Sequence, residues 1–225
     1  MAGQLSSHSL ARLAGGLFLA IMVTAVLAEF FIRAGLLDYT DGAAMRASLA
    51  AHEAQFRLSI TLDLLCFVMI PAISMILFRL LHPVNGLAAS FGLAFRMGEA
   101  ITMVCVAVFS VGLLTISGMT PAASADGLDE MAFLLLRLHN GGYHFGLIFW
   151  SLGTMFFALA LFQSLLVPKA LSALGVFAGV SGLVAHFVWL NAPEVFGSVG
   201  GLVYLPAFLF EVGLGLWLLV FGAGR

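Results

Sequence analysis

Ionisable side chains stand inside long apolar runs of this sequence, where they could bind a ligand, relay protons or hold a metal ion. The acids are Glu29, Asp63, Glu99 and Glu211, and the arginines are Arg33, Arg96 and Arg137. Glu29 and Arg33 are four residues apart and Arg96 and Glu99 are three apart, so each pair can neutralise itself on one helical face. Asp63 and Glu211 have no base at such a spacing. Each needs a partner from another helix, or a proton.

Three histidines, His139, His144 and His186, lie in or beside the same apolar runs. Imidazoles and carboxylates are the ligands of zinc and non-haem iron sites, so His144, His186 and Glu99 form a candidate metal set. Histidines paired across helices could also hold a haem, and a chain of acids and histidines could relay protons. The sequence has no His-Glu-x-x-His motif that would decide for a metal. The cofactor, if there is one, stays open.

Three functional interpretations fit these residues. The first is a purely structural or partner-binding network, since four acids against three arginines come close to charge balance. It predicts closed pairs, Glu29 with Arg33 and Arg96 with Glu99, and no cavity. The second is binding of a small ligand or ion, or proton-linked transport, through an outward pocket that joins Glu99, His144 and Glu211. The third is a metal- or cofactor-dependent enzyme, with three ligand atoms converging on one point.

Several other chemistries lack their motifs. The chain has no Gly-x-Ser-x-Gly elbow, no phosphate-binding loop ending in Gly-Lys-Ser or Gly-Lys-Thr, and no Cys-x-x-Cys. The net charge is −2 and the nine basic residues are scattered, which argues against a nucleic-acid partner. Hydrolase, nucleotide-binding and thioredoxin-type functions therefore lose their usual support.

The elements that position these residues are predicted to be transmembrane helices. Hydrophobic residues make up 62% of the 225 positions and charged residues 9%, whereas soluble domains have about 25% charged residues. A membrane span needs about 20 apolar residues. We therefore expect one all-helical domain over residues 1–225, a bundle embedded in the lipid bilayer, with spans near 13–36, 57–81, 87–116, 143–166, 170–190 and 201–222.

The positions of basic residues predict the orientation of this bundle. Arg12, Arg79, Lys169 and Arg225 all fall on one side, while the third and fifth loops on the other side carry acids and no base. By the positive-inside rule both termini are expected to be cytoplasmic, in a bacterial inner membrane. Aromatic residues at the outer span ends, Tyr39, Tyr143, Trp189 and Tyr204, agree with an interfacial belt.

Two loops and several small residues add detail. Met45, Leu49 and Phe56 share one face of a predicted helix near 41–56, which would lie on the outer membrane surface. Residues 131–142 are expected to extend the fourth span. Small residues spaced four apart, Gly142 with Gly146 and Gly175 with Gly179, are typical of close helix packing.

Several segments, in order along nearly the whole chain, resemble the bacterial multi-pass membrane family called domain of unknown function 4386. They include Arg12-Leu13-Ala14-Gly15, Ala28-Glu29-Phe30-Phe31-Ile32-Arg33, Asp63-Leu64-Leu65, Phe95-Arg96-Met97-Gly98-Glu99-Ala100, Leu138-His139 and Phe210-Glu211. The resemblance implies a membrane protein of six or seven helices and supplies no reaction. Glu29, Arg96, Glu99, His139 and Glu211 match the family pattern. Asn140 stands where the family often has Asp, which weakens a carboxylate mechanism at that point.

Overall fold

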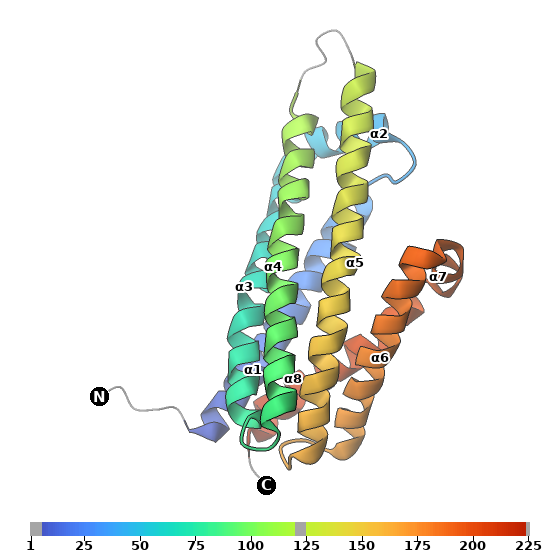
Figure 1. Ribbon diagram of the computed structural model, residues 1–225. Coiled ribbons are helices and arrows are strands. Elements are labelled where there is room, and N and C mark those ends of the chain that lie inside the picture. The colour runs from blue at the N-terminus through green and yellow to red at the C-terminus, as the bar shows by residue number, and fades with distance from the viewer. Residues whose placement is uncertain (1–5, 120–124, 224–225) are drawn as a thin grey trace.

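The computed structural model describes residues 6–119 and 125–223, and these residues form a helical bundle (Figure 1). No strand occurs in this described part of the chain, so the all-helical prediction is confirmed. The long helices are α1 (Ser7–Val26), α3 (Glu53–Leu81), α4 (Gly86–Ser117), α5 (Ala125–Gln163), α6 (Lys169–Asn191) and α8 (Leu205–Phe221). Short elements complete the chain: η1 (Leu27–Ile32), η2 (Arg33–Gly35), α2 (Gly42–Ala51), α7 (Pro193–Val199) and η3 (Gly200–Tyr204).

Six helical segments in the described residues are long and apolar enough to cross a membrane. They follow the predicted order, and the fourth begins earlier than its predicted span, because residues 131–142 belong to the continuous helix α5. Helices α3, α4, α5 and α6 lie side by side in sequence order, and α1 packs against both α3 and α8 (Figure 1). The start of α1 and the end of α8 lie at the same end of the bundle. Arg225 and Pro121 fall outside the described residues.

Glycines let the helices approach closely, as the small-residue spacing predicted. A Cβ on Gly179 would lie 2.7 Å from the Ser151 carbonyl oxygen, and one on Gly175 would lie 2.4 Å from the Phe210 ring. Gly142 and Gly146 of α5 meet Val106 and Met103 of α4 in the same way. These contacts set the register in which α4 and α5 present their polar residues to each other.

A second apolar cluster lies at the end of the bundle away from the start of α1. Helix α5 has 39 residues, which is about 58 Å of helix against about 30 Å of bilayer core. Its first turns and the end of α4 bury Met45 and Leu49 of α2 and Phe56 of α3 almost completely. The helix predicted near 41–56 thus ends at Ala51, Phe56 belongs to α3, and the apolar face of α2 packs on protein. Arg46 of α2 also forms an ion pair with Asp129 of α5.

Candidate functional site

One polar cluster, the Arg33 cluster, joins residues from four helical segments: Glu29, Arg33, Asp63, Ser110 and His139. The Arg33 side chain is 2% exposed, and its Nη2 donates to Asp63 Oδ2. Its Nη1 lies 3.3 Å from Glu29 Oε2 and 3.2 Å from His139 Nε2. The Glu29 side chain is 45% exposed, whereas that of Asp63 is 9% exposed. Asp63 thus pairs with a base from another helix, as expected from the absence of a base three or four residues away in the sequence.

The contact with Arg33 fixes the protonation of His139. A guanidinium only donates hydrogen bonds, so His139 Nε2 must accept from Arg33 and carries no hydrogen. The ring hydrogen then lies on Nδ1, which donates to Ser110 Oγ at 3.0 Å. The imidazole is therefore neutral in this arrangement, and the cluster holds two carboxylates against one cation.

A π-helical turn brings Glu29 and Arg33 together. Helix α1 widens at η1, where the Arg33 amide donates to the carbonyls of both Ala28 and Glu29. Such π-bulges are rare in proteins and occur frequently at functional sites. The wide turn keeps both side chains on the side of the helix that contacts α3.

A second polar cluster, the Glu211 cluster, contains Arg96, Glu99, Trp150 and Glu211, all less than 10% exposed. Arg96 and Glu99 lie within electrostatic range of Glu211. Arg96 Nη1 lies 2.9 Å from Glu99 Oε2, yet neither atom has a partner in hydrogen-bonding geometry. We regard the contact as an ion pair without a hydrogen bond. The Trp150 Nε1 donates to Glu211 Oε1 at 2.8 Å. This cluster also holds two carboxylates and one guanidinium.

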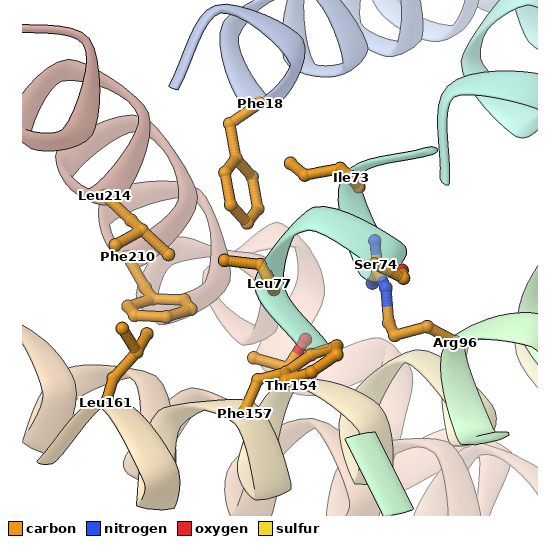
Figure 2. Close-up of a pocket in the computed structure, with 10 residues that line it drawn as sticks. All are labelled: Phe18, Ile73, Ser74, Leu77, Arg96, Thr154, Phe157, Leu161, Phe210 and Leu214. Atoms are coloured by element: carbon orange, nitrogen blue, oxygen red, sulfur yellow. The ribbon is translucent and has the colours of Figure 1, made fainter. Parts of the chain in front are cut away.

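A small cavity borders the Glu211 cluster in the centre of the bundle (Figure 2). Its volume is about 10 Å³, which is room for about one water molecule. Polar side chains of Ser74, Arg96 and Thr154 contribute to an otherwise apolar lining, and Figure 2 shows Arg96 beside Ser74. Glu99, His144 and Glu211 do not line it, so this cavity is not the outward pocket that we expected to join them.

A third polar group is the pair His144 and His186. Their Nδ1 atoms lie 2.9 Å apart, so one ring donates to the other. The Trp189 ring stacks on His144 with ring centres 4.0 Å apart, and Phe196 meets the same ring edge-on. No three His, Cys, Asp or Glu side chains in the described residues gather as a metal site would require. Glu99 pairs with Arg96 and lies apart from the two histidines. Metal binding by His144, His186 and Glu99 stays a prediction.

The tertiary structure thus separates the predicted site residues into three groups. Along α4, Ser110 of the Arg33 cluster follows Glu99 by eleven residues, which is about 16 Å. Arg137 belongs to none of the groups: its side chain is exposed and lies over the Phe133 ring, 4.6 Å from the ring centre. Sequence reasoning missed Ser110 and Trp150. Trp150 could have been suspected, because a buried indole N–H needs an acceptor.

The described residues thus hold six membrane-length apolar helices that enclose polar clusters, which is the architecture of a multi-pass membrane protein. The chain belongs to the family described as domain of unknown function 4386, whose model matches residues 13–222. The resemblance seen in the sequence is thereby confirmed. Comparisons with curated proteins and with solved structures find no match.

Proposed function

We propose that this chain is a proton-linked membrane protein, in which the Glu211 cluster takes up and releases one proton as a small ligand binds or crosses. The charge count of the clusters carries this proposal. The Arg33 cluster sets Glu29 and Asp63 against Arg33, and the Glu211 cluster sets Glu99 and Glu211 against Arg96. Each cluster has one carboxyl more than its arginine can neutralise.

An excess carboxylate inside an apolar bundle is costly. Burial without a counter-charge disfavours the ionised form strongly, and such a group takes up a proton or a cation instead. Arginine cannot supply the balance by changing its own charge, because it does not deprotonate in proteins. The neutral His139 adds no positive charge. Both acids of the Glu211 cluster are buried, so its second carboxyl is the group that we expect to exchange protons.

The proposed setting is a bacterial inner membrane with both termini in the cytoplasm. Arg12, Arg79 and Lys169 support this orientation, because they stand near the start of α1, the end of α3 and the start of α6. These three helix ends lie at one end of the bundle (Figure 1). Arg12 also ties α1 to α8 at that end, since its Nε donates to the Leu219 carbonyl at 2.9 Å. Glu29 lies seventeen residues further along, about 25 Å away, which places it near the opposite edge of the hydrocarbon core.

Proton titration of the purified protein tests the proposal. Infrared difference spectra recorded across a pH series follow the carboxyl C=O band, which exists only for protonated acids. Between about pH 5 and pH 9 we expect Glu211→Gln to remove a titrating band, and the surface variant Glu53→Gln to leave the spectra unchanged. Glu53 is a fair control because it pairs with Arg57 at an exposed position. Spectra of Glu211→Gln identical to those of the unmodified chain would contradict the proposal.

A structural network is the second candidate, and a specific observation favours it. The closed pairs that it predicts, Glu29 with Arg33 and Arg96 with Glu99, are both present. Such a network fixes helix register and leaves its acids permanently ionised or permanently protonated. The infrared titration separates the two candidates, because a purely structural network shows no carboxyl that changes its protonation between about pH 5 and pH 9.

A further inference from the structure

A depression of about 340 Å³ lies between the end of η2 and helix α2, at the edge of the first membrane-length segment. It is lined by residues 35–39 with Ala44 and Ser48. The volume falls in the range of small-molecule sites. Its lining is apolar at Leu36 and Leu37 and polar at Asp38, Tyr39 and Ser48, so it suits a molecule that is itself amphiphilic.

The charges around this depression are negative. The Asp38 carboxylate accepts hydrogen bonds from the Thr40 hydroxyl at 2.6 Å and from the Thr40 and Asp41 amides. These bonds hold the pKa of Asp38 below its usual range, so it is ionised at neutral pH. Among the described residues that line the depression there is no Lys or Arg. The nearby Arg33 is already engaged by Asp63, Glu29 and His139.

Tyr39 connects the depression to the Arg33 cluster. Its side chain is half-exposed and lies within electrostatic range of both Glu29 and Arg33. Burial of its other half raises the pKa of the Tyr39 phenol, which therefore stays neutral and offers an aromatic face. An aromatic face in the same depression as an ionised carboxylate attracts cations, and quaternary ammonium groups are recognised by aromatic rings in this way.

We propose that this depression binds an amphiphilic organic cation, an amine or quaternary ammonium with an apolar tail, with its charge beside Tyr39 and Asp38. Such a ligand concentrates at the membrane interface, where the depression opens. Binding at this site does not depend on the proton exchange proposed for the Glu211 cluster.

Equilibrium dialysis with tetraphenylphosphonium tests the site on the whole chain in a neutral detergent. Tetraphenylborate, which has the same shape and the opposite charge, separates charge recognition from simple apolar partition, and empty micelles give the background. We expect the cation to bind at least about tenfold more tightly than the anion. Asp38→Asn and Tyr39→Leu should each weaken cation binding about fivefold or more. Glu53→Gln should leave it unchanged.

Asparagine at position 38 can still accept the Thr40 and Asp41 hydrogen bonds, so the first variant tests charge with little change to the turn. Tyr39→Phe keeps the ring and is expected to recover the affinity that Tyr39→Leu loses. Two results would each overturn the site. One is equal binding of the cation and the anion. The other is a cation affinity of Asp38→Asn and Tyr39→Leu that equals that of the unmodified chain.

The dialysis measures binding at the depression, and the infrared titration measures proton exchange in the Glu211 cluster, so failure of this inference and failure of the proposed function are distinguishable.

Discussion

Replacing Gly15 by alanine is expected to force α1 and α8 apart. A Cβ at this position would lie 2.3 Å from the Leu219 nitrogen, 2.6 Å from the Gly215 oxygen and 2.9 Å from the Leu218 carbonyl carbon. All three atoms are backbone, so no side-chain rotation can relieve the contact. The neighbouring Gly16 provides a matched control, because a Cβ there meets nothing within 4 Å.

The magnitude follows from the distances. An ordinary contact of carbon with nitrogen needs roughly 3.4 Å, so the two helices must separate by about 1 Å, which forfeits up to half of the dispersion energy at the contact. Overpacking of this kind costs about 3 kcal/mol when the backbone itself obstructs the new atom. The higher helix propensity of alanine offsets about 1 kcal/mol of this loss of stability. Gly15→Ala is therefore expected to lose about 2 kcal/mol, and Gly16→Ala to gain up to about 1 kcal/mol.

The assay is reversible unfolding in mixed micelles with increasing sodium dodecyl sulfate, followed by tryptophan fluorescence. The two variants should differ by about 3 kcal/mol in the free energy of unfolding, with opposite signs relative to the unmodified chain. Equal stability of Gly15→Ala and Gly16→Ala would refute the close approach of α1 and α8 at this glycine. The arrangement of the two helices that carry Glu29 and Glu211 would then need revision.

The same unfolding assay checks three further expectations. Asp63→Asn removes the buried partner of Arg33 and should cost about 3–5 kcal/mol, most of which the double variant Arg33→Met, Asp63→Leu should regain; no loss in the single variant would contradict the pair. Arg137→Gln should change stability by less than about 1 kcal/mol, because its side chain is exposed over Phe133; a loss as large as that of Asp63→Asn would place it inside the network. His144→Ala leaves His186 Nδ1 without its partner and should cost about 1–3 kcal/mol. Elemental analysis of the same samples tests the metal alternative. A stoichiometric metal that is present in the unmodified chain and absent from His144→Ala would support metal binding by His144, His186 and Glu99.

The sequence predicted the helical segments because their determinants are local. About 20 apolar residues suffice to span a bilayer, and proline and polar breaks end each run without reference to the rest of the chain. The same local reasoning found the pairs Glu29 with Arg33 and Arg96 with Glu99, since neighbours on one helix face follow from spacing alone. The family resemblance was likewise carried by short segments in order.

The tertiary structure decided which side chains from different helices meet. Asp63 meets Arg33, Trp150 meets Glu211, and His144 meets His186 across helix interfaces whose register depends on glycines such as Gly142 and Gly179. Spacing along the chain holds no information on that register. For the same reason the sequence could not tell that Arg137 lies outside the clusters. The excess carboxyl in the Glu211 cluster, on which the proposed function rests, is therefore a property of helix packing, because only packing determines which charges share one buried space.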